Sequence, residues 1–517
     1  MKIKIILLFS LLLMLFNTAC DEYLDVMPDN RTELDSDEKI TKLLVDAYPR
    51  NPFIITTETS SDNTDWKEYS TLSSFGIFHD QLFHWEAVGE KSDDGPSAYW
   101  ESAYSSIAVA NHVLLKIEEL GNPERLNPQK GEALLARAYN HFYLVNIFAK
   151  TYSEKTGEND LGVPYAEEPE TTVNPHYKRE SVAEVYRRIE RDLEAGLPLI
   201  DDNLYEIPKY HFNRKAAYAF AARFYLFSRK YDKVIACAKE VLGEKPENML
   251  RNMQEFATMT SDFQLRAKHY VKAQHNANLL ITACYGNAYS YGNYNNGKLY
   301  QHSRQIASAE TIQSAGPWGL YTGTVFVLPP SSYTANYVAT PKLPYYFEYT
   351  DPVARIGYRH TMVVNLTTDE TLLCRAEAYI MQQDYDNAVK DLGLWISRHT
   401  TTGVILTRNI VNDYYSEIPY YRPEDPTVKK ELHPEFPIVS AEQENFLQCL
   451  LHIRRIETIH EGLRWFDVNR FGIVIYRRYL DANDNITVLD ELKVDDPRRA
   501  IQLPHTVISA GLTPNPR

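Results

Sequence analysis

Two segments of the chain repeat the same helical-hairpin pattern, and this repeat constrains the fold more than any other feature. The segment from Phe212 to Leu242 overlays the segment from Leu366 to Ile396, with an offset of 154 residues. In each segment a helical run with small residues is followed by a tight turn and a second helix that opens with Tyr-Asp. The matched pairs are Ala222 and Ala376, Tyr225 and Tyr379, Leu226 and Ile380, Tyr231 and Tyr385, Asp232 and Asp386, and Val234 and Ala388. The chain is therefore predicted to be mainly α-helical, with helices packed in pairs.

The two hairpins resemble the tetratricopeptide (TPR) repeat, in which small residues let two helices approach closely and an aromatic residue fills the gap between pairs. The copies are irregularly spaced, so no regular solenoid is implied. Two unrelated helical hairpins are the alternative. Apolar periodicity predicts further helices over residues 34–48, 99–120 and 130–150. Helix starts are also predicted where a capping box occurs, at Ser181, Thr367 and Ser440.

Three stretches lack helical periodicity. Residues 151–180 are interrupted by prolines and are predicted to form a loop. Residues 270–365 are rich in Gly, Asn and Tyr, and we expect mostly ordered loop there, with short strands such as residues 324–328. A loop region of this length is usually functional or disordered, and its aromatic content argues against disorder. Residues 480–517 are expected to form an irregular tail.

The start of the chain has the pattern of a secretory signal, because Lys2 and Lys4 precede an apolar run over residues 5–16. The run is too short for a membrane-spanning helix, which needs roughly 20 apolar residues. Small residues before Cys20 resemble the lipobox of bacterial lipoproteins. We therefore expect residues 1–19 to be removed and Cys20 to carry the lipid that anchors the chain. An ordinary cleaved signal with an incidental Cys20 is the alternative.

Composition narrows the class of partner. The formal net charge of −15 disfavours a polyanion such as nucleic acid. No cofactor is predicted; Asp93 and Asp94 could bind Ca²⁺, but the spacing of a calcium-binding loop is absent. The remaining cysteines form no C-x-x-C pair, which argues against a zinc ribbon or a thioredoxin-type motif. They are expected to be small buried residues: Cys237, Cys284, Cys374 and Cys449.

Several motifs together resemble the SusD/RagB family of Bacteroidetes outer-membrane lipoproteins. The most specific motif runs from Arg454 to Asp467 and is similar to the family pattern R-R-x-E-(x)₃-E-G-x-R-W-F-D, with His460 where Phe is more usual. The acidic start after Cys20, Asp21-Glu22-Tyr23-Leu24-Asp25, also fits. So do the W-x₃-Y-x₂-I-x₃-N spacing that begins at Trp100, the helical run over residues 131–152 and the TPR-like pairs. The resemblance covers essentially the whole chain.

The resemblance implies a SusD-like domain over residues 20–517, with an N-terminal part over about 21–230 and a C-terminal SusD/RagB part over about 270–517. About four TPR-like helix pairs would pack against an irregular, loop-rich half that carries the binding face. The protein would be lipid-anchored in the outer membrane and face the cell exterior. There it would capture oligosaccharides and deliver them to a SusC-like TonB-dependent transporter. The alternatives are RagB-like capture of peptides and a structural TPR lid without ligand contact.

An enzyme is not predicted. The sequence has no G-x-S-x-G, no P-loop and no H-E-x-x-H motif. Glu457 and Glu461 have the spacing of one helical turn and could be mistaken for the carboxylate pair of a glycosidase. Arg454, Arg455 and Arg464 lie beside them in the sequence, so an ion-pair network is the simpler interpretation.

Aromatic residues among polar ones in loops are the predicted ligand-binding groups. Sugar rings present C–H faces that stack on Tyr or Trp, while their hydroxyl groups need amide or carboxylate partners. Two loop regions have this composition, one near residue 65 and one between residues 287 and 321. The predicted ligand-binding residues are Asp65, Trp66, Tyr69, Tyr289, Tyr291, Asn293, Tyr294, Trp318 and Tyr321. Burial in a local loop core is the alternative for each aromatic ring.

Overall fold

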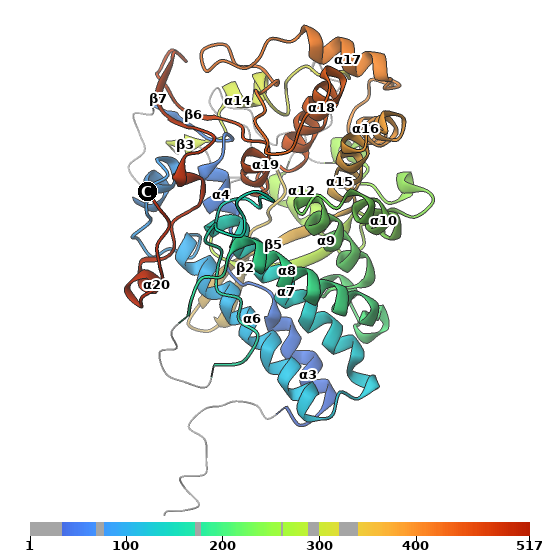
Figure 1. The fold of residues 1–517 in the computed structure, drawn as a ribbon, viewed down its shortest axis with the longest axis vertical. Helices are drawn as coiled ribbons and strands as arrows, with labels where there is room; N and C mark the ends of the chain where they lie inside the picture. The colour runs from blue at the N-terminus through green and yellow to red at the C-terminus, as the bar shows by residue number, and fades with distance from the viewer. Residues whose placement is uncertain (1–33, 69–76, 171–176, 260–261, 288–298, 320–339) are drawn as a thin grey trace, which may run out of the picture. The chain divides into compact units, whose positions relative to one another are not determined.

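The computed structural model describes residues 34–68, 77–170, 177–259, 262–287, 299–319 and 340–517 (Figure 1). The chain divides into a short unit, Met1–Ile40, and a large unit, Thr41–Arg517. Helix α3 (Asp37–Leu43) begins in the first unit, and the elements below belong to the second. Predictions for Cys20 and for the leader over residues 1–19 lie outside the described residues.

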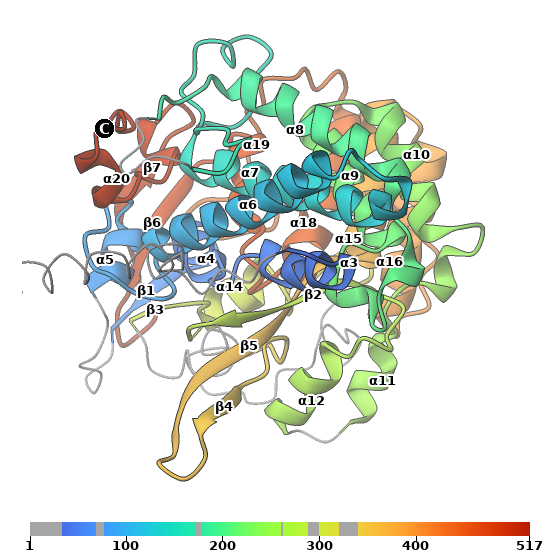
Figure 2. The same ribbon diagram turned by 90° about the horizontal axis from the view of Figure 1, so that it is seen from below.

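Helices dominate the large unit, as the fold-class prediction required. The predicted hairpins are α9 (Arg214–Phe227) with α10 (Tyr231–Leu242), and α15 (Thr368–Met381) with α16 (Tyr385–His399). The helices predicted over 99–120 and 130–150 are α6 (Pro96–Glu119) and α7 (Asn127–Phe148). Helix α7 packs on α6 and α8, α10 packs on α9 and α15, and α18 packs on α15 and α17 (Figures 1 and 2). The remaining helices of this layer are α8 (Val182–Gly196), α17 (Arg408–Glu417) and α18 (Ala441–Glu457).

All three predicted capping boxes mark real helix starts. The hydroxyl of Ser181 accepts a hydrogen bond from the backbone N–H of Glu184. In the same way, Thr367 accepts one from Glu370 and Ser440 accepts one from Gln443. Each contact satisfies one of the backbone donors that a helix start leaves without an intrahelical partner. The local sequence therefore determines where these helices begin.

Residues 270–365 are more regular than predicted. Strands β2 (Asn278–Tyr285), β4 (Tyr346–Asp351) and β5 (Ile356–Thr367) form an antiparallel sheet in the order β2-β5-β4. Most of β2 is buried, so its sequence lacks the alternation that marks a strand with one wet face. The strand expected over residues 324–328 lies outside the described residues.

A second sheet joins distant parts of the sequence in the order β3-β1-β6-β7. Its strands are β1 (Asp65–Lys67), β3 (Tyr300–Gln301), β6 (Ile475–Leu480) and β7 (Ile486–Leu492). Strand β1 runs parallel to β6 and antiparallel to β3. The prediction of an irregular tail over residues 480–517 is therefore wrong, since β7 pairs with β6 in register.

Short helices complete the large unit. They are η1 (Leu44–Ala47), α4 (Ile54–Ser60), α5 (Ile77–Phe83), α11 (Met253–Thr258), α12 (Phe263–Tyr270), α14 (Arg304–Ala309), α19 (Arg464–Arg470) and α20 (His505–Ser509). The four described cysteines are buried, as predicted, and they are unbridged. Within the described residues, no helix combines enough length and hydrophobicity to cross a lipid bilayer.

Candidate functional site

Trp66 differs from the other tryptophans of the chain in being partly accessible to solvent. All six tryptophans lie in described residues, and five of them are at most 5% exposed. Trp66 is half-buried, in the middle of the three-residue strand β1. A ring in this position can offer a face to a ligand while its edge is held by the protein.

The neighbours of Trp66 form an aromatic cluster that we define as Trp66, His84, Tyr300 and Tyr479. Tyr300 and Tyr479 are the partners of Trp66 on the two neighbouring strands, so the three side chains lie in one row across the sheet. Their ring centroids lie 6.1 and 5.1 Å from that of Trp66, and the ring of His84 approaches edge-on at 6.4 Å. Tyr300 is buried, whereas the other three rings are half-buried.

Two carboxylates border this aromatic cluster. Asp80, on α5, accepts a hydrogen bond from the hydroxyl of Tyr300 and lies 3.9 Å from the ring of His84. Glu68 follows β1 directly, is exposed, and its hydrogen bond raises the pKa of Tyr479. Accessible ring faces beside carboxylates match the two needs of a sugar, which are a surface for its C–H face and acceptors for its hydroxyl groups.

Most of the other predicted binding residues lie outside the described residues. This applies to Tyr69 and Tyr321, and to the Tyr- and Asn-rich group Tyr289, Tyr291, Asn293 and Tyr294. Their contact with a ligand stays a prediction.

Two predicted binding residues are buried, which corrects the expectation that they are accessible. Trp318 is 1% exposed, and its ring packs 4.8 Å from His452 and 6.2 Å from Trp395. Asp65 is also 1% exposed, and both its carboxylate oxygens accept hydrogen bonds from Arg478 at 2.8 and 2.9 Å. In neither case does the side chain reach the surface, because tertiary contacts from distant segments cover it.

A buried ion-pair network, which we define as Asp62, Asp65, Glu310, Lys430, Arg455, Arg464 and Arg478, holds the start of β1 in place. Arg464 forms two hydrogen bonds to the carboxylate of Asp62, at 2.8 and 2.9 Å. Arg455 bridges Asn63 and Glu310 at 2.9 and 2.8 Å. These contacts fix the backbone directly before Trp66.

The electrostatics of the network favour charged carboxylates. Burial alone would raise the pKa of Asp62, but the guanidinium groups of Arg455 and Arg464 hold it well below its usual range. Burial would also raise the pKa of Glu310. Its cationic neighbours overcome this effect and lower the pKa to about 2; they are Lys430, Arg478 and Arg455. Arg455 and Arg464 of the C-terminal motif are ion-paired, as predicted, but their partners are Asp62 and Glu310 from distant segments rather than Glu457 and Glu461.

The two glutamates of the motif do not share a helix face, contrary to the prediction. Helix α18 ends at Glu457, and the chain turns through residues with positive φ at His460 and Gly462. Glu457 accepts a hydrogen bond from the indole N–H of Trp395 at 2.8 Å, while Glu461 pairs with Lys342 at 2.8 Å. Each carboxylate thus has a separate structural partner.

One buried carboxylate near the motif should make stability depend on pH. Burial raises the pKa of Glu58 from 4.5 to about 7, although hydrogen bonds from Asn63 and Gly462 oppose the shift. The folded state keeps this proton to a higher pH than the unfolded state does. Protonated Glu58 therefore adds to the free energy of unfolding below pH 4.5, and this contribution is lost as the pH rises through 7. The free energy of unfolding of the wild type should fall by about 2–4 kcal/mol between pH 4.5 and 8 because of this group, and Glu58→Gln should not show that fall. Urea unfolding at each pH measures both.

The matched control is Glu118→Gln, which changes an exposed glutamate on α6. It should leave the wild-type pH profile of unfolding unchanged. If Glu58→Gln also keeps the full slope, the proton is held by another group and the assignment to Glu58 is wrong.

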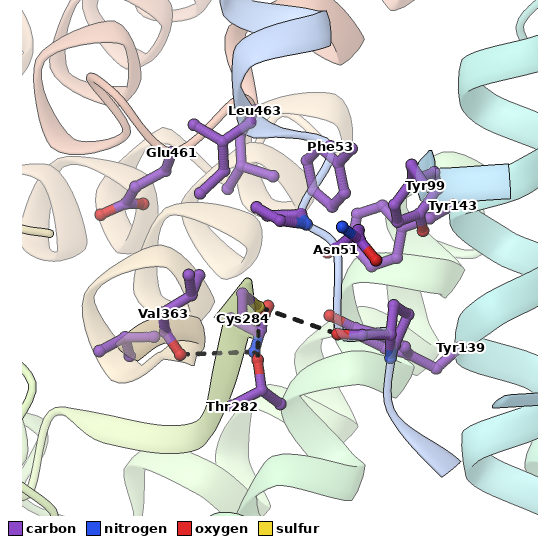
Figure 3. A pocket seen from close by; sticks show the side chains of 15 residues that line it. Asn51, Phe53, Tyr99, Tyr139, Tyr143, Thr282, Cys284, Val363, Glu461 and Leu463 are labelled. Carbon is purple, nitrogen blue, oxygen red and sulfur yellow. Dashed lines mark hydrogen bonds between the residues drawn. The ribbon is translucent and has the colours of Figure 1, made fainter. Parts of the chain in front are cut away.

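Figure 3 shows an internal cavity whose lining includes Asn51, Tyr99, Tyr143, Cys284 and Glu461. Its volume is about 30 Å³, which is room for about two water molecules. The hydroxyl of Tyr99 has no hydrogen-bond partner among the described residues, so an ordered water fits there. The cavity is too small for a sugar and is a packing feature.

A larger cavity of about 210 Å³ lies beside α6 and α20. It is an alternative ligand-binding site to the aromatic cluster. Its lining includes Trp100, Tyr104, Tyr177 and Glu170. Tyr177 is 41% exposed and donates a hydrogen bond to Glu170 at 2.5 Å. The cavity therefore has aromatic and acidic groups too, but Trp100 is buried, as the sequence predicted.

Comparisons with known proteins agree with this fold. The family described as SusD-like, "Starch-binding associating with outer membrane", matches residues 22–226. A SusD superfamily protein from Bacteroides thetaiotaomicron has a TM-score of 0.61 at 18% identity, covering 92% of this chain and 98% of its own. A SusD-like carbohydrate-binding protein from Bacteroides vulgatus also has a TM-score of 0.61, at 16% identity over 92% of this chain and 96% of its own. A laminarin-binding SusD-like protein has a TM-score of 0.54 at 17% identity, over 93% and 98%.

A search of curated proteins gave no match. The mainly α-helical fold, with TPR-like pairs beside an irregular half, is that of SusD-like proteins. The family model thus matches the N-terminal part of the chain, and the likeness to these solved structures extends to the fold of the rest.

Proposed function

We propose that this protein is a non-enzymatic glycan-binding lipoprotein of the outer membrane. The observation that carries the proposal is the aromatic cluster, in which Trp66 is the accessible tryptophan of the chain and its ring neighbours Tyr300 and Tyr479 contact two acidic side chains, Asp80 and Glu68. The sugar ring would stack on Trp66, and its hydroxyl groups would donate to the carboxylates. Relatives described as carbohydrate-binding and laminarin-binding support a glycan as the ligand class.

The proposal also covers the cellular location of the protein and its partner. Lipidated Cys20 would anchor the chain in the outer membrane, facing the cell exterior. The matching family is described as associating with the outer membrane, which supports this membrane as the location. The bound oligosaccharide would pass to a SusC-like TonB-dependent transporter. Capture of peptides, as in the RagB branch, is the competing function and is separated by the choice of ligand in the test.

Intrinsic fluorescence provides a direct test, because Trp66 is the tryptophan that a ligand can reach. The chain from residue 21 onward would be titrated with plant, host and microbial glycans and with mixed peptides. A bound glycan should change the tryptophan emission, protect it from acrylamide quenching, and raise the melting temperature in proportion to ln(1 + [L]/Kd). Trp66→Phe removes the indole that reports binding, so this variant should show no fluorescence response to the ligand.

Each outcome discriminates between the functions. A fluorescence response to a glycan supports glycan capture at the aromatic cluster. A response to peptides alone assigns the protein to peptide capture. A melting-temperature shift without a fluorescence response would place the ligand elsewhere and overturn the assignment to Trp66.

A further inference from the structure

Three side chains beside the β2-β5-β4 sheet converge without any role in the proposed glycan site. Glu255 lies on α11, His269 in the last turn of α12, and His275 in the turn that leads to β2. One ligand atom from each of the three residues lies within 4.8 Å of the others. Figure 2 shows α11 and α12 as a neighbouring pair that lies beside the β4–β5 hairpin.

The two histidines have unused ring nitrogens. The Nε2 atoms of both His269 and His275 are buried and have no hydrogen-bond partner among the described residues. His269 Nε2 lies 3.1 Å from Glu255 Oε1, but not in hydrogen-bond geometry. Leaving a buried polar atom unsatisfied costs about 1–3 kcal/mol, so Nε2 of His275 indicates an absent partner, while His269 Nε2 already faces the carboxylate of Glu255.

Either ring nitrogen of a neutral histidine can bind a metal. In His275 the Nε2 atom is buried and has no hydrogen-bond partner among the described residues, so this nitrogen is the one available to a metal.

The backbone around His275 is held firmly. Its own carbonyl accepts a hydrogen bond from Lys209 Nζ at 2.6 Å. The buried side chain of Asn278 donates to the carbonyls of Tyr270 and Lys272 at 2.8 and 2.9 Å. The ring of Phe256 packs against both imidazoles, with centroids 5.0 and 6.1 Å away. The histidines are thus preorganised, and Glu255, whose side chain is 50% exposed, is free to adjust.

We propose that Glu255, His269 and His275 form a binding site for a divalent metal of the zinc type. Two imidazole nitrogens and one carboxylate oxygen are a ligand set that Zn²⁺ takes, with a fourth position left for water. At bond lengths of about 2.0–2.1 Å, tetrahedral ligand atoms lie about 3.3 Å apart, so small side-chain rotations close the present arrangement. The metal would join α11 to the turn between α12 and β2.

The test is titration of the chain from residue 21, without an affinity tag and after removal of metals with EDTA, by ZnCl₂ in a calorimeter. One equivalent should bind and the melting temperature should rise. Co²⁺ in place of Zn²⁺ should give the visible absorption of tetrahedral coordination. Glu255→Gln and His275→Ala should each weaken Zn²⁺ binding at least tenfold and abolish the rise in melting temperature.

The matched control is His433→Ala, since His433 is an exposed histidine that lies 3.6 Å from the carboxylate of Glu431 without a third ligand. This variant should bind Zn²⁺ like the wild type. Both site variants should match the metal-free wild type in circular dichroism, and Glu255→Gln changes an exposed side chain that tolerates substitution. Zinc binding that is absent, or that persists unchanged in both site variants, would overturn the proposal.

Discussion

Arg464→Ala is expected to lower the free energy of unfolding by about 3–5 kcal/mol, because it leaves the carboxylate of Asp62 buried without its bidentate partner. Both side chains are less than one-tenth exposed, so water cannot replace the lost hydrogen bonds. Arg455 and Lys430 lie farther from Asp62, at 3.6 and 4.0 Å, and cannot supply the same two-point contact. Urea unfolding followed by circular dichroism measures the effect.

The matched control for this prediction is Arg214→Ala. Arg214 forms an ion pair with Glu240 at 3.0 Å, but both side chains are about half exposed. An exposed pair contributes at most about 1 kcal/mol, so this variant should unfold almost like the wild type. Equal effects of the two arginine substitutions would show that burial of the network is not what stabilises the start of β1.

Trp66→Ala is expected to weaken glycan binding at least about thirtyfold, which corresponds to about 2 kcal/mol. The loss has a simple physical cause, because the substitution removes the ring face on which the sugar would stack. The neighbouring rings of Tyr300 and Tyr479 pack against its edge at 6.1 and 5.1 Å and cannot take its place without moving their strands. Calorimetric titration with the glycan found in the screen gives the change in Kd.

Tyr177→Ala is the control for the weaker glycan binding expected of Trp66→Ala. It truncates an exposed aromatic residue in the alternative site, the cavity beside α6 and α20. It should leave the Kd of the glycan unchanged. If Tyr177→Ala abolishes binding and Trp66→Ala does not, the ligand occupies that cavity and the aromatic cluster is not the site. The melting temperature of each variant without ligand shows whether it remains folded.

The two experiments are linked through the backbone of residues 62–65. Arg464 holds Asp62 and Arg478 holds Asp65, so the network sets the position of the residue that follows. A milder substitution, Arg464→Lys, keeps the charge but loses the two-point geometry. It should weaken glycan binding while the chain stays folded, because the aromatic ring is then less firmly placed.

Elements that depend on neighbouring residues were predictable from the sequence. Ser181, Thr367 and Ser440 each cap a helix through a hydrogen bond to a backbone N–H three residues later, so the signal lies within a few residues. The two repeated hairpins, Phe212–Leu242 and Leu366–Ile396, follow from the spacing of small and aromatic residues within each segment. The ion-pair character of the C-terminal motif follows from its mixture of arginines and carboxylates.

Elements that depend on distant partners were not predictable in the same way. Strand β2 is buried, so it shows no alternation of apolar and polar residues, and β7 is defined by its pairing with β6. The spacing of Glu457 and Glu461 fits one helical turn, but α18 ends at Glu457 and the chain turns at His460 and Gly462. The convergence of Glu255 with His269 and His275 likewise joins two helices and a turn that no sequence motif connects.

The sequence by itself determined the helical repeats and the capped helix starts, because those features arise from contacts between residues close in the chain. Only the tertiary structure decided which aromatic residues are accessible. Trp66 and Trp318 both lie in sequences that resemble binding loops, yet Trp318 is covered by Trp395 and His452 from the helical half. Trp66 stays partly accessible because the rings that pack around it, those of Tyr300 and Tyr479 on the flanking strands and that of His84, leave its side chain only half-buried.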